Sequence, residues 1–292
     1  MSVHPKDFFG SLRPTVIIGP GLIGGSLALA LREKVPGAPL RVWARERSLQ
    51  KTREALGGGI FVTSDVREAV EGSGLVVFCC PIGAMQGLAR EMRGVLGDAL
   101  VTDAGSVKGP VVEVLEPILG ERFVGAHPMA GGERGGIEAA SGNLFEGATC
   151  IITPGAETAA EAIAGIRSFW EGVGCRVLSM SASQHDRLVA LASHLPHAVA
   201  SALTLAVGSG DAQGGSGPLD VIGRGFRDST RIAAGPAGLW AEIFLANRAE
   251  VLLALRDFLG ACHEFEAMLR DANAAELEDF LSRAGMIRRR LG

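Results

Sequence analysis

Two hydrophobic patterns divide the chain. Between Thr15 and about Val177, short runs of β-branched and aliphatic residues alternate with stretches whose apolar residues recur at helical spacing. Strands and helices in alternation predict a parallel, doubly wound sheet. The predicted strands are Thr15–Gly19, Leu40–Ala44, Leu75–Cys79, Ala99–Thr102, Phe123–Gly125, Ala148–Ile152 and Cys175–Leu178, and the predicted helices between them are Ile23–Lys34, Ser48–Leu56, Ala84–Leu96, Val111–Leu119 and Thr158–Gly172.

After Ser179 the strand pattern stops. Three long helices with dense apolar positions are predicted instead, over Ser181–Val207, Pro236–Leu259 and Ala275–Leu291. Helices this apolar bury more than one face, against one another or against a second subunit. We therefore expect a homodimer that forms through this half. The glycine-rich stretch Gly208–Gly217 is predicted to connect two of the helices.

These patterns predict the fold class: α/β, with a Rossmann-like, doubly wound, mostly parallel sheet followed by an all-helical dimerisation domain. We expect the α/β domain over residues 13–179 and the helical domain over residues 180–292. A chain of 292 residues is long enough for two domains of ordinary size. Its 47% content of apolar residues supports a well-buried core and argues against global disorder.

Charge and cysteine content narrow the class of protein. A formal net charge of -4 leaves no positive excess to neutralise a phosphate backbone, so no nucleic-acid partner is expected. The five cysteines lack the spacing of a zinc site and are expected to be buried free thiols in a reducing cytosol. No secretion signal is recognised at the N-terminus, and no uninterrupted apolar run reaches the roughly 20 residues of a membrane helix. These features predict a soluble, cytoplasmic protein with no membrane partner.

A glycine-rich turn links the first predicted strand to the first predicted helix. Gly19 allows the tight turn, Gly21 lets the backbone approach a pyrophosphate, and Gly24 lets the helix pack on the strand. With Leu22 and Ile23, these residues place backbone N–H groups at a helix N-terminus, where anions bind. The bare motif can also be a plain turn, but its position after the first strand favours a dinucleotide-binding domain.

The residues after the second predicted strand bear on which dinucleotide binds. An acidic residue there usually holds the ribose 2′-hydroxyl of NAD, but this chain has Ala44 followed by Arg45. A guanidinium at this position can pair with a 2′-phosphate and stack on adenine, so we expect NADP to be preferred. NAD remains possible if Arg45 is a solvated loop residue and Glu46 takes the acidic role. Further along, Cys80 and Pro81 end a strand and are expected to line the nicotinamide ribose.

Candidate chemistry gathers in a second glycine-rich loop, Gly125–Gly136. It contains a titratable base, His127, and a carboxylate, Glu133, among several glycines. Such a loop lets backbone approach a ligand closely while the scaffold holds the base. Because the loop lies downstream of the dinucleotide-binding turn, the two together indicate a redox active site.

Four motifs, in order, resemble the prephenate/arogenate dehydrogenases of tyrosine biosynthesis. They are Thr102–Lys108, the loop around His127, Ser193–His197 and Arg227–Ile232, and the resemblance extends from about Thr15 to Trp240. It implies an enzyme that oxidises the ring carbinol of a cyclohexadienyl acid. Hydride passes to the nicotinamide while the ring carboxylate leaves as CO₂. Which of prephenate and L-arogenate is used stays open.

The resemblance also implies roles for single residues. His127 would be the general base that takes the carbinol proton, and Ser106 would hydrogen-bond the same hydroxyl. Arg231 would bind a substrate carboxylate, and His197 would contact the substrate side chain. Glu133 would act as a gate at the pocket mouth. An imidazole whose pKa is near 6.5 is a competent proton acceptor at neutral pH, so the role of His127 is chemically sound.

Several of these residues have simpler interpretations. His194 and His197 lie three apart on one helical face, but a metal site lacks a third ligand, and His194 is interpreted as a hydrogen-bonded core residue. Arg231 could instead be a structural ion-pair partner of Asp228. His185 and Asp186 resemble the first turn of a helix more than a catalytic pair. Trp240 is most simply a core residue, although the resemblance places it near the pocket.

Two other functions remain open at this point. A β-hydroxyacid dehydrogenase or imine reductase shares the predicted architecture, but usually relies on a lysine or aspartate on the interdomain helix. A non-catalytic NADP-binding sensor would need no base, serine and arginine in this order.

The chain also leaves no room for a regulatory ligand-binding domain after the helical half, so any inhibition by tyrosine is expected at the active site itself.

Overall fold

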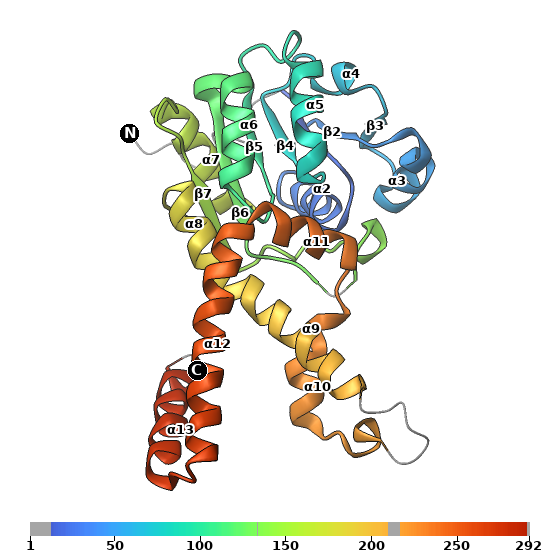
Figure 1. The fold of residues 1–292 in the computed structure, drawn as a ribbon. Coiled ribbons are helices and arrows are strands. Elements are labelled where there is room, and N and C mark those ends of the chain that lie inside the picture. Colours follow the sequence, from blue (N-terminus) through green and yellow to red (C-terminus); the bar gives the residue numbers. More distant parts are fainter. Residues whose placement is uncertain (1–12, 133, 210–216, 291–292) are drawn as a thin grey trace.

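A single eight-stranded sheet organises the first half of the protein. The computed structural model describes residues 13–132, 134–209 and 217–290. The strand order is β3-β2-β1-β4-β5-β6-β7-β8, and neighbours pair in parallel except β6 with β7 (Figure 1). The strands are β1 Thr15–Ile18, β2 Leu40–Trp43, β3 Phe61–Thr63, β4 Leu75–Phe78, β5 Leu100–Asp103, β6 Phe123–Pro128, β7 Thr149–Thr153 and β8 Arg176–Ser179.

Helices cover both faces of this sheet, and the second half is all helical. The predicted fold class is therefore confirmed. The helices of the first half are α2 Leu22–Lys34, α3 Leu49–Leu56, α4 Val66–Val70, α5 Ile82–Met92, α6 Gly109–Leu119 and α7 Ala160–Gly172. Those of the second half are α8 Ala182–Val189, a π-helical turn Ala190–His194, α9 Leu195–Gly208, α10 Arg224–Thr230, α11 Ala237–Ala246, α12 Arg248–Arg270 and α13 Ala274–Arg289.

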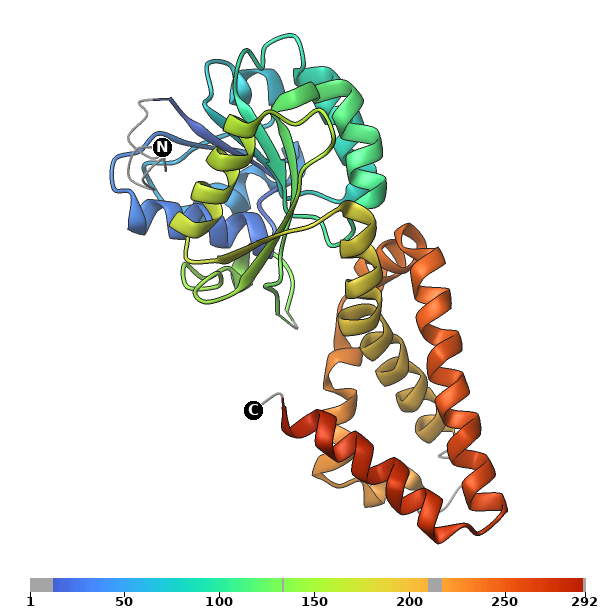
Figure 2. The same cartoon turned by 90° about the vertical axis from the view of Figure 1, so that its left-hand side faces the viewer.

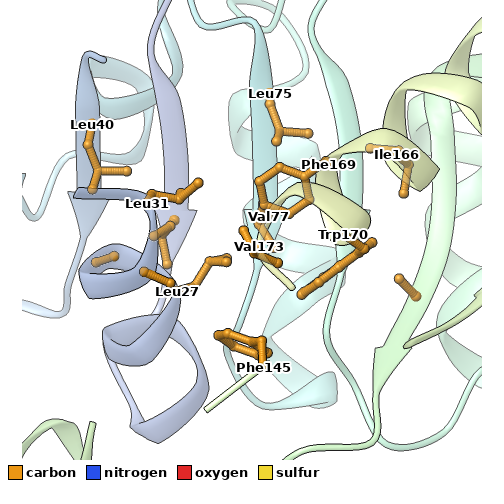
Figure 3. Close-up of a cluster of buried hydrophobic side chains, with 14 of the residues drawn as sticks. Leu27, Leu31, Leu40, Leu75, Val77, Phe145, Ile166, Phe169, Trp170 and Val173 are labelled. Carbon is orange, nitrogen blue, oxygen red and sulfur yellow. The ribbon is translucent and has the colours of Figure 1, made fainter. Parts of the chain in front are cut away.

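A layer of hydrophobic side chains packs on each face of the sheet. Because successive residues of a strand point to opposite faces, Ile17 belongs to one cluster and its neighbour Val16 to the other. Helices α2 and α7 cover the first face, and α4, α5 and α6 cover the second. Figure 3 shows Leu27 of α2 opposite Phe169 and Trp170 of α7 across the first layer. This packing gives the sheet's carboxyl edge a rigid support.

Some short or interrupted elements differ from the sequence-based expectation. The strand β3 and the helices α4 and α10 are missing from the prediction because they span only three to seven residues. The predicted helix Pro236–Leu259 is two helices, broken at Asn247. The side chain of Asn247 is buried and donates a hydrogen bond to the backbone oxygen of Asp186, 2.9 Å away. This contact joins residues 61 positions apart in the sequence, so the local hydrophobic pattern could not predict it. Most of the predicted connector Gly208–Gly217 lies outside the described residues.

The helical half leaves much of its apolar surface uncovered. Its buried cluster consists of Ala190, Val251 and Ala254, with a few partly buried neighbours. Helices α9 and α12 run outward from the α/β half, and α13 folds back against α12 (Figures 1 and 2). Large apolar side chains on α9, α11 and α12 are exposed, among them Leu203, Leu205, Leu239, Leu245, Leu252, Leu253 and Leu259.

One helical run, Ala182–Gly208, is long and apolar enough to cross a membrane by length and composition alone, and 28% of its most apolar window is buried. Core helices of folded domains meet the same criteria, so this is weak support for a membrane span. The run also carries the buried histidines His185, His194 and His197. All five cysteines are free, but Cys262 is exposed, so the expectation of buried thiols is wrong for that residue.

Candidate active site

The glycine turn after β1 has the shape that a bound dinucleotide requires. Gly19 has a φ of +106°, and a Cβ there would lie 3.0 Å from the backbone of Cys79. A Cβ on Gly24 would overlap the carbonyl oxygen of Gly19, whereas Gly21 faces open space. Helix α2 begins directly after Gly21 with no side-chain cap and no acidic residue in its first turn. Its free N–H groups and dipole therefore fit a pyrophosphate.

The end of β2 carries the residues that face an adenosine ribose in this fold. Ala44 is fully buried, and Arg45, the next residue, is exposed. The carboxylate of Glu46 accepts a hydrogen bond from the hydroxyl of Ser64, 2.5 Å away, so it is engaged on the side of the β3–α4 loop. Of these three side chains, Arg45 is the one that combines a positive charge with exposure.

The neighbouring turn after β4 contributes two more predicted residues. Cys80 is half-buried and Pro81 begins the approach to helix α5. Burial is the main reason that the pKa of Cys80 is raised to about 12, so its thiol stays protonated at neutral pH. A neutral thiol can line a cofactor but has little nucleophilic character.

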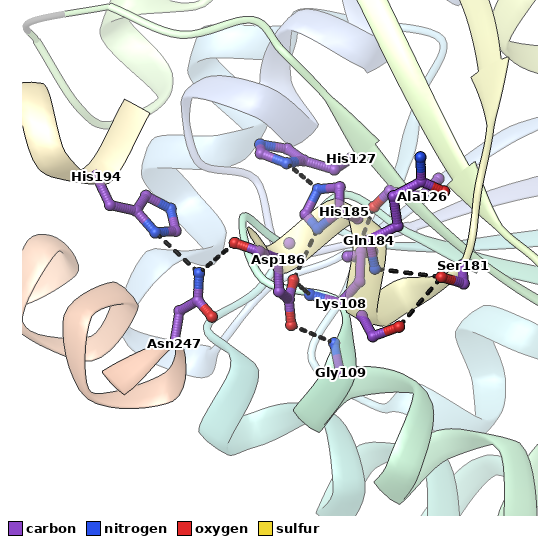
Figure 4. A network of polar contacts seen from close by, with 12 residues as sticks. Lys108, Gly109, Ala126, His127, Ser181, Gln184, His185, Asp186, His194 and Asn247 are labelled. Carbon is purple, nitrogen blue, oxygen red and sulfur yellow. Dashed lines mark hydrogen bonds and ion pairs between the residues drawn. The ribbon is translucent and has the colours of Figure 1, made fainter. Parts of the chain in front are cut away.

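His127 lies at the carboxyl end of β6 and is buried. Its Nδ1 is 2.8 Å from Nε2 of His185, and the two rings meet edge to face (Figure 4). Burial is the first reason that the pKa of His127 lies well below its ordinary value of 6.5, and the nearby His185 and Lys108 lower it further. At neutral pH the imidazole is therefore uncharged, which is the form that accepts a proton.

The hydrogen bonds continue from His185 to Asp186. His185 Nδ1 lies 2.7 Å from Asp186 Oδ1. The Asp186 carboxylate also accepts the backbone N–H groups of Lys108 at 2.7 Å and Gly109 at 2.8 Å, at the N-terminus of α6. Burial raises the pKa of Asp186, but the hydrogen bonds from His185, Lys108 and Gly109 outweigh it and the net pKa is lowered.

The structure thus corrects one interpretation made from the sequence. His185 and Asp186 do lie in the first turns of α8, as expected, but they also contact His127 through an unbroken series of hydrogen bonds. The contact arises because α8 packs against the start of α6 and the end of β6, which are far away in the sequence. The one signal that could have suggested it was the adjacent His-Asp pair near the start of a predicted helix.

A buried ion pair fixes the backbone just before His127. Lys108 and Asp103 are both fully buried and form a salt bridge. Asp103 accepts the backbone N–H of Ala126 at 2.9 Å, and Lys108 donates to the Ala126 carbonyl oxygen at 2.6 Å. The β5–β6 ladder pairs only as far as Val124, so these side chains take over the role of the ladder there. Both residues lie in the motif Thr102–Lys108, but neither was given a role from the sequence.

The helical half contributes a separate aromatic cluster. The ring of His197 stacks on Trp240 with 3.6 Å between centroids and 13° between planes. Its Nδ1 is buried without a hydrogen-bond partner among the described residues, and burial lowers its pKa. His194 is buried and lies 3.2 Å from the side-chain nitrogen of Asn247, which supports its interpretation as a hydrogen-bonded core residue. The described residues contain no group of three or more potential metal ligands.

The remaining predicted residues lie around this region. Ser106 is half-buried in the loop between β5 and α6. Arg231 is exposed and begins a 3-10 turn, Arg231–Ala234, that packs against α9. This turn leads to Gly235, where a Cβ would lie 3.2 Å from His197 Cε1 and closer still to Trp240. Glu133 lies outside the described residues.

Contacts between the halves place the two sets of residues at one edge of the sheet. Asp186 joins α8 to the start of α6, as described above. In addition, the backbone N–H of Gly83, in the first turn of α5, donates to the carboxylate of Glu242 in α11 at 3.1 Å. The carboxyl ends of the strands, where an open α/β sheet binds its ligands, are therefore capped by the helical half.

Comparison with known proteins bears on both halves. Residues 27–179 match the family described as prephenate dehydrogenase, nucleotide-binding domain, and residues 181–283 match prephenate dehydrogenase, dimerization domain. A cyclohexadienyl dehydrogenase of Zymomonas mobilis is 36% identical over 267 residues, which cover 91% of this chain and 90% of that protein.

Solved structures give the same picture. The crystal structure of prephenate dehydrogenase from Aquifex aeolicus, in complex with hydroxyphenyl propionate and NAD⁺, superposes with a TM-score of 0.89 and 32% identity, over 97% of this chain and 99% of that one. An arogenate dehydrogenase from Synechocystis superposes with a TM-score of 0.80 and 27% identity, over 96% of this chain and 100% of that one.

Proposed function

The chain belongs to the prephenate dehydrogenase family, and from this premise we propose that it carries out the oxidative decarboxylation of prephenate, L-arogenate or both in tyrosine biosynthesis. The substrate is a ring acid that carries a carbinol and a carboxylate. A nicotinamide dinucleotide, held at the glycine turn, supplies the hydride acceptor. The observation that carries the proposal is His127, a buried and uncharged imidazole at the carboxyl edge of the sheet.

In the proposed reaction His127 takes the proton of the ring carbinol. Ser106, in the adjacent loop, donates to or accepts from the same hydroxyl and holds it against the imidazole. Burial lowers the pKa of His127 and so keeps its imidazole in the uncharged form that can accept a proton. The return of the proton to the ring oxygen completes the aromatic product after the carboxylate has left as CO₂.

The helical half is proposed to bind the substrate. Arg231 would pair with a carboxylate, for which a guanidinium is the best-suited donor. His197, held rigid against Trp240, would offer its unpartnered Nδ1 to the substrate side chain. The proposed gating role of Glu133 rests on the family resemblance alone. In this division, residues 13–179 form the dinucleotide-binding domain and residues 180–292 form the helical domain.

The test of the activity is the formation of reduced dinucleotide and CO₂ from each ring acid. Prephenate and L-arogenate are each offered with each of NAD⁺ and NADP⁺ to the purified chain. We expect turnover with at least one pair, and the ratio of kcat/KM values then assigns the substrate. If neither acid is turned over with either dinucleotide, the chain is not a dehydrogenase of these acids, and dinucleotide binding without turnover would point to a sensor.

NADP is the proposed preferred cofactor, with NAD as the alternative. The proposal is supported by exposed Arg45, by buried Ala44 in the position of the usual carboxylate, and by the engagement of Glu46 with Ser64. Replacing Arg45 by Ala should raise KM for NADP⁺ and leave KM for NAD⁺ nearly unchanged, because only NADP⁺ has a 2′-phosphate. A wild-type kcat/KM that is higher for NAD⁺ would overturn the preference.

We further propose a homodimer through the helical half. Leu205 and Leu245 are more than two-thirds exposed, at 71% and 72%, and the family matched by this half is described as a dimerization domain. Sedimentation at micromolar concentration should give twice the mass of the chain. A monomer mass under those conditions would contradict the proposal.

A cytoplasmic location is proposed as well, supported by the free cysteines.

A further inference from the structure

Three side chains in a row determine where His127 carries its proton. Asp186 and His185 are 2.7 Å apart, and His185 and His127 are 2.8 Å apart (Figure 4). A neutral imidazole has one N–H donor and one bare nitrogen, so each hydrogen bond in the series fixes the next. Once the donor and the acceptor between Asp186 and His185 are known, the donor and the acceptor between His185 and His127 follow.

Asp186 is that first member, and it can only accept. Its Oδ1 receives the backbone N–H of Lys108, and its Oδ2 receives the backbone N–H of Gly109. These donors, at the positive end of helix α6, stabilise an ionised carboxylate. The proton between Asp186 and His185 must therefore belong to His185 Nδ1. A neutral His185 then has a bare Nε2, which can only accept from His127.

We propose that Asp186 and His185 are positioning residues that hold His127 in the tautomer with its proton on Nδ1 and its Nε2 bare. The bare nitrogen is the one not engaged with His185, so it is the nitrogen available to a substrate hydroxyl. The tautomer follows from the hydrogen bonds and a neutral His185, whereas its use in proton abstraction rests on the proposed function.

The same series gives the proton somewhere to go. The carbinol O–H bond breaks and an Nε2–H bond forms on His127. The Nδ1–H proton of His127 can then move to His185 Nε2, which leaves His127 neutral and His185 as an imidazolium beside the Asp186 carboxylate. When the ring becomes aromatic, the proton returns along the same path to the product oxygen. No proton is gained or lost by the three side chains over the cycle.

Other charged or titratable groups near His127 do not compete for this role. Lys108 approaches from the start of α6, but its ammonium is paired with Asp103 of β5 and with the Ala126 carbonyl. His194 approaches from the π-helical turn, and its Nδ1 faces the amide of Asn247. The Asp186 carboxylate is thus the anion that His185 contacts directly.

The tautomer can be measured without any turnover. In a protein labelled with ¹⁵N in its histidine rings, the two nitrogens of a fixed tautomer have clearly different shifts, one protonated and one bare. The chain has six histidines, and the signals of His127 are those that disappear in a His127→Gln variant. We expect wild-type His127 to have a protonated Nδ1 and a bare Nε2. A protonated Nε2 with a bare Nδ1 would overturn the proposal.

Two substitutions at position 185 separate the hydrogen bond from the packing. His185→Phe keeps an aromatic ring against His127 but removes both nitrogens, so His127 should show a mixture of tautomers. His185→Gln can still donate to Asp186 and accept from His127, so the tautomer should be retained. If His127 in the Phe variant keeps one pure tautomer, identical to the wild type, the proposal fails.

Kinetics provide the second measurement. With His185→Phe, kcat should fall by roughly 10- to 100-fold with KM nearly unchanged, the range found when a partner that orients a metal-bound imidazole is removed. His185→Gln should recover much of that loss. Asp65→Asn is the matched control, because Asp65 accepts two backbone N–H bonds at the start of α4, far from His127, and kcat should stay at the wild-type value. Equal kcat for the Phe and Gln variants would contradict the proposal. An inactive wild type would refute the proposed function, while the ring shifts would still decide the tautomer.

Discussion

The two halves of the molecule differ in how completely they bury their own apolar surface. The α/β half has a continuous hydrophobic layer on each face of its sheet, and strand residues such as Val16, Ile17 and Val77 are fully buried. The helical half has a buried cluster of three residues and a long series of exposed leucines. The first half buries its apolar residues within one chain, whereas the second exposes apolar side chains of the kind found at protein interaction surfaces.

This difference matches the proposed division of chemistry. The base and the dinucleotide turn require positions fixed to a fraction of an ångström, and they lie on strands whose packing is finished within the chain. The proposed substrate contacts lie on helices whose environment a second copy would complete. The comparison predicts that substitutions in the first half affect chemistry or folding, and that those on α9 to α13 affect substrate binding and assembly. His185 and Asp186 of α8 contact the end of β6 and the start of α6, so their substitutions are expected to affect chemistry.

The largest expected effect is on kcat, from His127→Ala. Loss of a general base should lower kcat by about 10²- to 10⁴-fold, while the dinucleotide Kd and the dimer mass stay unchanged. Steady-state kinetics with dinucleotide binding measured separately would check this. His263→Ala is a suitable control, because His263 is exposed on α12 and far from the base in the sequence and in the fold. A His127→Ala enzyme with a nearly normal kcat would contradict the proposal that His127 is the general base.

Lys108→Met should give the next largest effect, on folding. It leaves the fully buried Asp103 without its counter-charge, which typically costs about 3–5 kcal/mol of unfolding free energy. Denaturant unfolding followed by circular dichroism measures that loss. The control is Lys51→Met, which breaks an exposed pair with Glu138 and should cost much less unfolding free energy, because water screens that pair. Equal losses for the two variants would mean that the buried pair does not support the backbone at Ala126.

Arg231→Ala tests the helical half. Removing a charge-assisted contact of roughly 1.5–3 kcal/mol should raise KM about 10- to 150-fold with a smaller change in kcat. Arg231→Lys keeps the charge but not the planar guanidinium, so its KM should lie between those of the wild type and the Ala variant. An unchanged KM for the Ala variant would assign Arg231 to a structural role, such as the ion pair with Asp228.

The smallest effect per group is expected from pH. The pKa values of His127, His194 and His197 are all lowered from 6.5 by burial, that of His194 to about 4. Below pH 6.5 these histidines bind protons in the unfolded chain but stay unprotonated in the folded chain. The free energy of unfolding should therefore fall as pH falls. Each group changes it by at most about 1.4 kcal/mol per pH unit. Melting temperatures from pH 8 to pH 5 would check the sign, and a Tm that rises on acidification would contradict it.

The sequence predicted what depends on local pattern and missed what depends on tertiary contact. The alternation of strands and helices, the glycine turn and the boundary of the helical half are local signals, and the fold class followed from them. The break at Asn247 and the contact of His185 with His127 depend on α8 packing against α6 and α12, which no window of sequence contains. Lys108 lies in one of the four motifs, but its ion pair with Asp103 was not predicted, since a lysine in a loop is usually solvated and this one is buried.

The family resemblance predicted the activity and single site residues, whereas the hydrophobic pattern predicted only the fold class. Four motifs in order identified the dehydrogenase family, and the match of both halves to that family decides against the alternative of a β-hydroxyacid dehydrogenase or imine reductase. The motifs named His127, Ser106, His197 and Arg231 without their surroundings. The structure adds those surroundings for His127 and His197, and the roles of all four remain proposals for the experiments above.

Chemical rescue of His127→Ala is the most direct test that an imidazole at this place is the base. The substitution leaves a space at the end of β6 into which free imidazole can diffuse. The turnover of the variant should rise in proportion to the concentration of added neutral imidazole, and the wild type should not respond. A variant rate that stays flat across the imidazole titration, with dinucleotide and ring acid bound, would contradict the central claim.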